Sequence, residues 1–460
     1  MSKFFNSIKN YFLQLKGKIK ILSGKTVVLL RVVESNCSSI WSQLLNKYSY
    51  LLLGILFIGI AIIIRMALVP FVSWDLYSFI FGWLRDFRSY GFSYLGNYGG
   101  DYPPAYMIIL YLISLLEPGF NLIGYGRTPL AAPINQIFAI KFVSTIFDVI
   151  MAVAIFFIIK KVSKNNTLLA FIGFTIALFL PTSILITGFW GQVDSSYVSL
   201  CLVAIAFMLY KKNRLGFLFY GFALAFKLQA IFFLPVIGVL WLNKEVKLRY
   251  LVFTFAAMLL TFLPSYIAGG RFDFPFLKYV NLTKEYGDPN YNSGSIFAFL
   301  QDISANPDNT KNNNSIITYA GLFFGFSVIL FTMFVIYKKN IKMTNRNFIT
   351  ISALFSILVP YVLPCMHERY FFFADLMILV YSILNLKRFY LVILSQLATS
   401  ITLNIYLFGI YPIPNLGGAN TKISALLNLV IICFLVADLS KAEKKEEQII
   451  ELQTLDIKEV

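Results

Sequence analysis

The sequence predicts an all-α polytopic membrane protein, and three observations carry this prediction. Of the 460 residues, 58% are hydrophobic and only 13% are charged, which is more apolar surface than an ordinary soluble fold can bury. Apolar segments of roughly 17 to 25 residues, the length of an α-helical span, recur along the chain. Short clusters of Lys and Arg separate these segments. The net charge of +17 therefore marks cytoplasmic helix ends rather than a nucleic-acid-binding face.

The chain begins with a basic segment, residues 1–48, in which lysines are interleaved with aromatic and aliphatic residues. This pattern is typical of a cytoplasmic segment that lies on anionic headgroups, and a plain solvated tail is the alternative. The first apolar span, about Ser49 to Val69, then runs outward and is closed by Pro70.

Residues 70–133 are predicted to form one large extracytoplasmic loop that contains short interfacial helices. If Tyr106 to Leu116 were a full span, the basic cluster at Lys160 and Lys161 would lie outside, against the positive-inside bias. At about 11 apolar residues this segment is also too short to cross the bilayer unaided.

The remaining basic clusters then fall on one side of the membrane. This gives a transmembrane domain of about twelve helices over residues 49–440, with both termini cytoplasmic. A second large outer loop covers residues 269–315, and a charged cytoplasmic tail covers 441–460. The apolar run 215–242 is interpreted as two half-spans that meet at a break near Lys227. The sequence contains no visible internal repeat, which argues against transporter folds built from inverted halves.

Polar residues that are unusual for membrane segments gather at the predicted outer ends of the spans. They are Asp75, Asp101, Asp194, Lys227, Gln229, His367, Glu368 and Arg369. An ionisable group at membrane depth is costly unless it is paired or faces a wet cavity, so their shared level predicts a site. His367 is the only histidine of the chain, and beside Glu368 and Arg369 it is suited to bind a phosphate.

Several of these residues also have a plainer interpretation. Asp75 is a suitable helix N-cap, and Lys227 is long enough to snorkel to the interface, as is Arg65. Lys141 and Asp148 lie about two turns apart in one apolar segment and are expected to pair structurally through other helices. Asp86, which is flanked by Arg85 and Arg88, is also interpreted as structural.

Five motifs occur in an order that resembles the GT-C class of polyprenyl-phosphate-sugar glycosyltransferases. They are Trp74-Asp75, Asp101-Tyr-Pro-Pro104, Gly191-Gln-Val-Asp194, Lys227-Leu-Gln229 and His367-Glu-Arg-Tyr370. The resemblance covers residues 49–390. It is strongest to bacterial proteins related to the mannosyltransferases of GPI-anchor assembly. The lumenal glucosyltransferases that extend the N-glycan precursor resemble the chain more distantly.

The resemblance implies a GT-C-like bundle with large first and fourth extracytoplasmic loops. It implies an inverting transfer of a hexose, mannose-like or glucose-like, from a polyprenyl-phosphate donor to a glycan, lipid or protein acceptor on the extracytoplasmic side of a bacterial cytoplasmic membrane. Asp75 matches the catalytic base, and His367, Arg369 and Lys227 match the groups that meet the donor phosphate. The predicted cavity residues are Trp74, Tyr77, Asp101, Tyr102, Gln192, Asp194, Gln229 and Glu368.

The first loop has no Asp-X-Asp pair, so neither a metal site nor a cofactor is expected beyond the lipid-linked sugar itself. The expected partners are the sugar donor, its acceptor and the lipid bilayer, without nucleic acid. Two alternatives remain open at this stage. One is a transporter or flippase of a lipid-linked oligosaccharide, and the other is a non-catalytic scaffold that binds a lipid-linked glycan.

Overall fold

The computed structural model describes residues 40–125, 128–282, 288–300, 311–412 and 418–456. The chain divides into two compact units, Met1–Phe57 and Ile58–Val460. In the first unit only residues 40–57 are described, and they form the first part of helix α2 (Ile40–Ala67). The prediction of a membrane-surface segment at residues 1–48 therefore lies almost entirely outside the described residues. All site residues discussed below belong to the second unit.

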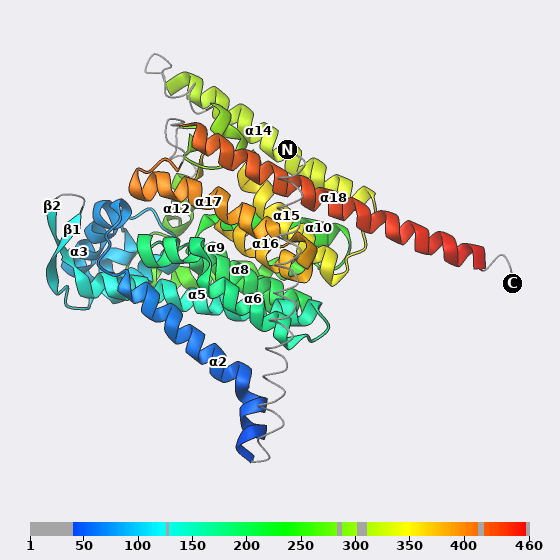
Figure 1. The fold of residues 1–460 in the computed structure, drawn as a ribbon. Helices are drawn as coiled ribbons and strands as arrows, with labels where there is room; N and C mark the ends of the chain where they lie inside the picture. Colours follow the sequence, from blue (N-terminus) through cyan, green and yellow to red (C-terminus); the bar gives the residue numbers. More distant parts are fainter. Residues whose placement is uncertain (1–39, 126–127, 283–287, 301–310, 413–417, 457–460) are drawn as a thin grey trace, which may run out of the picture. The chain divides into compact units, whose positions relative to one another are not determined.

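The described residues form an α-helical polytopic membrane protein, as predicted (Figure 1). Within the described ranges, six apolar helical segments are long and apolar enough to cross a bilayer, and a seventh is added if a bent pair is counted as one span. The six segments are Tyr48–Ala67, Ile134–Val162, Leu248–Ile267, Ile316–Lys338, Leu386–Phe408 and Ala419–Lys441. They belong to α2, α5 (Ile134–Val162), η5 (Leu248–Tyr250) with α11 (Leu251–Ile267), α14 (Lys311–Lys338), η7 (Leu386–Arg388) with α17 (Tyr390–Phe408), and α18 (Ala419–Asp456).

About twelve spans were expected, and the difference comes from apolar helices that are shorter than the hydrocarbon layer. Helix α8 (Asp194–Leu209) has 16 residues and α16 (Phe372–Leu384) has 13. At about 1.5 Å per residue, neither reaches the roughly 30 Å of a bilayer core. Both are almost completely buried within the second unit. Between these elements and the loops described next lie α9 (Asn213–Phe226), η4 (Leu228–Phe233), α10 (Leu234–Leu242) and α15 (Asn345–Val362).

The predicted first loop, residues 70–133, is built from short elements. They are η1 (Leu76–Ile80), α3 (Phe81–Tyr90), η2 (Gly91–Gly96), α4 (Pro104–Ser114) and the antiparallel hairpin of β1 (Phe120–Tyr125) and β2 (Thr128–Pro133). Helix α4 is short, as predicted, and begins with Pro104 in its first turn, where a missing N–H costs nothing. The hairpin was not predicted. Helix α4 packs against α3, α5, α9 and α11.

Two interruptions of the helices determine the positions of predicted site residues. Helix α6 (Thr167–Phe179) is followed at a bend of 41° by α7 (Pro181–Ser183) and the π-helix η3 (Ile184–Trp190). Helix α9 ends at Phe226, and Lys227 adopts an extended conformation before η4 begins. The predicted break in the run 215–242 is therefore present at Lys227.

The predicted second loop, residues 269–315, contains α12 (Phe274–Leu282), β3 (Asn290–Tyr291) and η6 (Ile296–Leu300). Strand β3 pairs in parallel with β4 (Met366–His367). The Tyr291 and His367 rings stack with centroids 4.7 Å apart. This loop therefore holds the segment that carries His367.

The buried charges of the membrane helices pair differently from the sequence-based expectation. Asp148 binds Arg65 rather than Lys141, with 2.6 Å between Arg65 Nε and Asp148 Oδ2. Arg65 has no exposed surface, so it does not snorkel to an interface. Thr187 also donates to Asp148 Oδ2, at 2.6 Å. The pairing of Lys141 with Asp148 was therefore wrong, because Arg65 occupies that carboxylate.

Candidate functional site

The Asp75 carboxylate is held by three hydrogen-bond donors from two distant parts of the chain. Oδ2 accepts from Trp190 Nε1 at 3.1 Å and from the Gln192 side-chain amide, and Oδ1 accepts from the Tyr406 hydroxyl at 2.6 Å. The Trp190 and Tyr406 rings stack with centroids 4.5 Å apart. Asp75 itself is half-buried.

The turn after η3 brings Trp190 and Gln192 to Asp75. Gly191 has φ +81°, a left-handed conformation that strains residues with a Cβ, and a Cβ there would also lie 3.0 Å from Leu76 Cδ1. Ser73 Oγ donates to the Trp190 carbonyl at 2.9 Å, which ties the turn to the segment that leads into Asp75. Glycine at position 191 therefore permits the close approach of the two segments.

Charged residues from three separate motifs form a second cluster. Lys227 Nζ lies 2.7 Å from Asp194 Oδ2, and Arg369 lies 2.8 Å from Glu368 Oε1. Arg369 Nε lies 3.6 Å from Asp194 Oδ2, so the two ion pairs are joined. All four side chains are buried. Buried charges of alternating sign stabilise one another, whereas each alone would be costly.

His367 ends β4, and Glu368 lies in the turn that follows. Burial and the contact between the two side chains determine their protonation. Burial disfavours the charged imidazole and lowers the pKa of His367, although the hydrogen bond with Glu368 acts in the opposite direction. Burial also works against ionisation of Glu368, but the contacts with His367 and Arg369 outweigh it and lower the Glu368 pKa. At neutral pH the cluster therefore holds an ionised Glu368 and a neutral His367.

Aromatic side chains connect the charged cluster to Asp75. The Arg369 guanidinium lies 4.9 Å from the centroid of the Trp190 ring, and Lys227 Nζ lies 5.6 Å from that of Tyr102. The Tyr102 hydroxyl donates to Gln192 Oε1 at 3.0 Å. Cations over aromatic faces are stabilised by the ring quadrupole. Asp75 and the four paired charges therefore belong to one continuous network.

Among the described residues, Asp194 Oδ1 and Arg369 Nε form no hydrogen bond. Buried polar atoms usually have a hydrogen-bond partner, so each of these two atoms keeps the capacity for one more hydrogen bond. Both residues belong to the charged cluster, in which Arg369 Nε lies 3.6 Å from Asp194 Oδ2.

The predicted site residues do not all join this network. The structure brings together Asp75, Tyr102, Gln192, Asp194, Lys227, His367, Glu368 and Arg369. Asp101 instead interacts with Lys278, which donates to the backbone carbonyls of Tyr98 and Gly100 at 2.8 and 3.0 Å.

Three other predicted residues, Trp74, Tyr77 and Gln229, lie next to members of the network in the chain. Trp74 and Tyr77 are exposed, with ring centroids 6.1 Å apart, on either side of Asp75 in the chain. Gln229 lies half-buried in the first turn of η4, two residues after Lys227.

Trp190 and Tyr406 were missed as site residues. Trp190 directly precedes the Gly191-Gln192 motif, so its position was an available signal. Tyr406 lies near the end of the apolar α17, eleven positions after Ser395 on the same stripe, and its sequence context carries no motif. Only the packing of α17 against η3 shows that it reaches Asp75.

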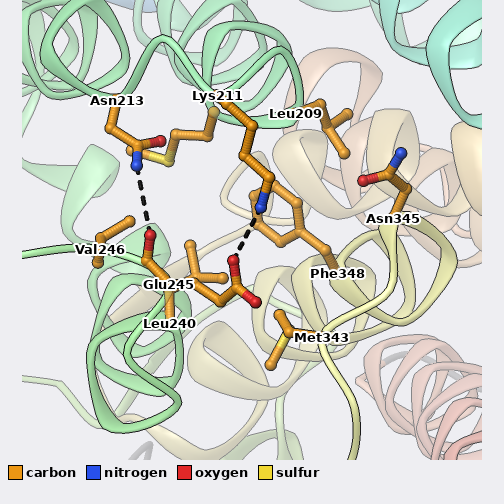
Figure 2. Close-up of a pocket in the computed structure, with 10 residues that line it drawn as sticks. Leu209, Lys211, Asn213, Leu240, Glu245, Val246, Met343, Asn345 and Phe348 are labelled. Atoms are coloured by element: carbon orange, nitrogen blue, oxygen red, sulfur yellow. Dashed lines mark hydrogen bonds and ion pairs between the residues drawn. The ribbon is translucent and has the colours of Figure 1, made fainter.

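A small pocket elsewhere in the second unit is built differently (Figure 2). Lys211 and Glu245 form an ion pair of 2.8 Å beside it, and Asn213 donates to the Glu245 carbonyl at 3.3 Å. Its lining also includes Met208, Met343 and Phe348 and contains none of the predicted site residues. The pocket lies among the basic clusters that mark the predicted cytoplasmic helix ends.

The chain matches no model of a known protein family and no curated protein.

Proposed function

We propose that this protein is an inverting GT-C-class glycosyltransferase that moves a hexose from a polyprenyl-phosphate donor to a glycan, lipid or protein acceptor. The observation that carries the proposal is the single network that joins Asp75 to Lys227 and Arg369. A transfer of this kind needs a base for the acceptor hydroxyl and cations for the leaving phosphate. The network offers both types of group within one connected set of side chains.

Asp75 is the proposed base. An ionised carboxylate offers about four acceptor positions, and Asp75 uses two at Oδ2 and one at Oδ1. We propose that the remaining position at Oδ1 accepts a hydrogen bond from the acceptor hydroxyl. As that oxygen attacks the anomeric carbon from the face opposite the phosphate, its proton passes to Oδ1, the bond from the anomeric carbon to the phosphate oxygen breaks, and the configuration inverts.

Lys227, Arg369 and His367 are the proposed donor-phosphate groups. Lys227 and Arg369 both approach Asp194 Oδ2, and a phosphate that enters would compete for the same donors. Neutral His367 can donate a hydrogen bond to a phosphate oxygen without adding charge. The exposed Trp74 and Tyr77 rings offer apolar faces on which a sugar can stack.

The finer topology is part of the same proposal. The bundle has about twelve membrane-embedded helical segments, full spans and shorter ones together, with large outer loops at residues 70–133 and 269–315. Both termini are cytoplasmic, and the site faces the outside of a bacterial cytoplasmic membrane. The lipid-linked sugar is a co-substrate, and no resident cofactor is proposed.

The decisive experiment measures transfer of label from polyprenyl-phosphate hexoses by the purified protein in nanodiscs. We expect one labelled hexose to appear in an acceptor fraction, with the anomeric configuration inverted. If every labelled donor stays intact while membrane extracts supply acceptors, the proposal is wrong.

A transporter of lipid-linked glycans is the second candidate, because the Arg65–Asp148 pair and Lys141 are buried inside membrane helices. In the same nanodiscs and in proteoliposomes, movement of an intact labelled lipid-linked glycan between leaflets without sugar transfer would favour it. Binding without either movement or transfer would favour a non-catalytic scaffold.

A further inference from the structure

Lys141 is a buried cation that the proposed reaction leaves unused. It lies in α5 with no exposed surface. Its ammonium donates to the backbone carbonyls of Leu68 at 2.7 Å, Phe71 at 2.7 Å and Phe189 at 3.0 Å. These contacts use all three protons of the ammonium group. Three well-placed carbonyls offset the cost of burying its charge.

The three carbonyls belong to the two segments that surround the Asp75 carboxylate. Leu68 directly follows α2, and Phe71 lies four residues before Asp75. Phe189 directly precedes Trp190, whose indole N–H donates to Asp75. Lys141 therefore binds both the segment that carries Asp75 and the turn that supplies its donors.

Neighbouring contacts reinforce the same arrangement. One turn further along α5, Ser144 Oγ donates to the Gln192 carbonyl at 3.1 Å. A Cβ at Gly191 would lie 3.4 Å from Lys141 Cε, so the lysine stem packs directly against the turn. One face of α5 thus fixes the Trp190-Gly191-Gln192 turn at both ends.

We infer that Lys141 is a positioning residue for the proposed base. It fixes the 68–71 segment against the 189–192 turn, and thereby sets the distance and direction of the hydrogen bonds that Trp190 and Gln192 donate to Asp75. The catalytic consequence of this inference rests on the proposed function. Its structural consequence, the geometry of the hydrogen bonds that Trp190 and Gln192 donate to Asp75, does not.

The donor-phosphate groups are held by other elements. Lys227 lies at the break after α9, and Arg369 lies in the turn before α16. Arg369 also touches the Trp190 ring, but its charge is held by Glu368 and Asp194, so loss of the Lys141 ammonium should disturb the base far more than donor binding. A displacement of about 1 Å at a reacting group can cost roughly 100-fold in rate. The expected signature is a lower kcat with a nearly constant donor KM.

The test compares Lys141→Met, which keeps the side-chain length but removes the ammonium, with Lys211→Met as a matched control. Lys211 pairs with Glu245 at the separate pocket (Figure 2). Both proteins are labelled with fluorotryptophan, since the chain has only five tryptophans, and the Trp190 signal is assigned with Trp190→Phe. We expect Lys141→Met to move the Trp190 fluorine signal and to lower kcat roughly 100-fold, with donor KM within about two-fold. Lys211→Met should change neither.

An unmoved Trp190 signal in folded Lys141→Met overturns the inference, and so does a moved signal with full kcat. If Lys141→Met does not fold, Lys141→Gln keeps a polar side chain but has only two N–H donors for the three carbonyls. It should then move the same signal and lower kcat to a smaller extent, and no effect on either overturns the inference. If the unsubstituted protein transfers no sugar, the proposed function fails, and the fluorine comparison still decides whether Lys141 sets the geometry around Asp75.

Discussion

A substitution at Asp75 can separate the chemical role of the carboxylate from its structural role. Asn at position 75 keeps the side-chain volume and an oxygen acceptor but cannot take up a proton. We expect Asp75→Asn to lower kcat for sugar transfer by roughly 10² to 10⁴-fold, the range attributed to general base catalysis. Donor binding, measured by titration with a polyprenyl-phosphate hexose, should persist because Lys227 and Arg369 are unaltered.

Asp86 provides the matched control, because it lies in the same predicted loop and accepts a hydrogen bond from Tyr94 at 3.0 Å, away from the network. Asp86→Asn should retain transfer. Full turnover of Asp75→Asn, or equal losses in both variants, would exclude Asp75 as the base.

At the residue scale, charge and motif order identified in advance most of the residues that the structure joins in one network. Asp194, Lys227 and Arg369 were identified because ionisable groups are rare at membrane depth, and the structure joins them. Asp101 looked equivalent in the sequence, yet it interacts with Lys278 instead. Side-chain direction decides between these outcomes. It depends on how α4 and α12 pack, which local sequence does not encode.

The Arg65–Asp148 pair is an interaction between elements, because it links α2, α5 and η3. Arg65 also donates to the Leu178 carbonyl at 3.0 Å, beyond its contact with Asp148. Asp148→Leu leaves this guanidinium buried without its carboxylate, which typically costs about 3 to 5 kcal/mol. We expect a clear fall in the thermal unfolding midpoint in detergent, with partial recovery in the double variant Arg65→Met/Asp148→Leu. A single variant as stable as the parent would contradict this account.

Lys278 of α12 binds the backbone carbonyls of Tyr98 and Gly100 in the first predicted outer loop, and the nearby Asp101 gives this region a pH-dependent stability. Burial raises the pKa of Asp101, and the nearby Lys278 charge offsets only part of this effect. The folded state therefore holds the proton more tightly than the unfolded state, whose pKa is about 3.9. The stability contributed by protonated Asp101 is complete below that value and is lost as the pH rises through the folded-state pKa.

This dependence can be isolated with Asp101→Asn, which does not titrate. The difference in unfolding midpoint between the parent and the variant should fall with rising pH above about 4 and then level off. A difference that grows with pH would mean that attraction to Lys278 outweighs burial.

At the element scale, breaks were easier to predict than lengths. The polar Lys227-Leu-Gln229 in an apolar run marks the end of α9 correctly. Helices α8 and α16 were expected as spans, because apolar composition alone does not distinguish a lipid-facing helix from one buried in protein. Their burial is a property of the bundle. The β1–β2 hairpin escaped prediction because its strands lack a clear alternation of polar and apolar residues.

For the whole molecule, membrane character follows from composition, whereas sidedness follows only from the placement of Lys and Arg. Six helical segments of the described residues are long and apolar enough to cross a membrane, whereas the short buried helices are not. The positive-inside bias nevertheless predicts on which side of the membrane two segments lie. It places η2 outside and the turn after α5, which follows Lys160 and Lys161, inside.

Cysteine accessibility tests this arrangement directly. Ser93 in η2 and Asn165 after α5 are exposed, so each can carry a single cysteine in a background where the four native cysteines are replaced. In intact cells, a membrane-impermeant maleimide should label Ser93→Cys and leave Asn165→Cys unlabelled until the cells are permeabilised. Labelling of both sites in intact cells would point to leakage, which a cytoplasmic marker protein reveals. The reverse pattern would place the Asp75 network on the cytoplasmic side and remove the basis for an extracytoplasmic, lipid-linked donor.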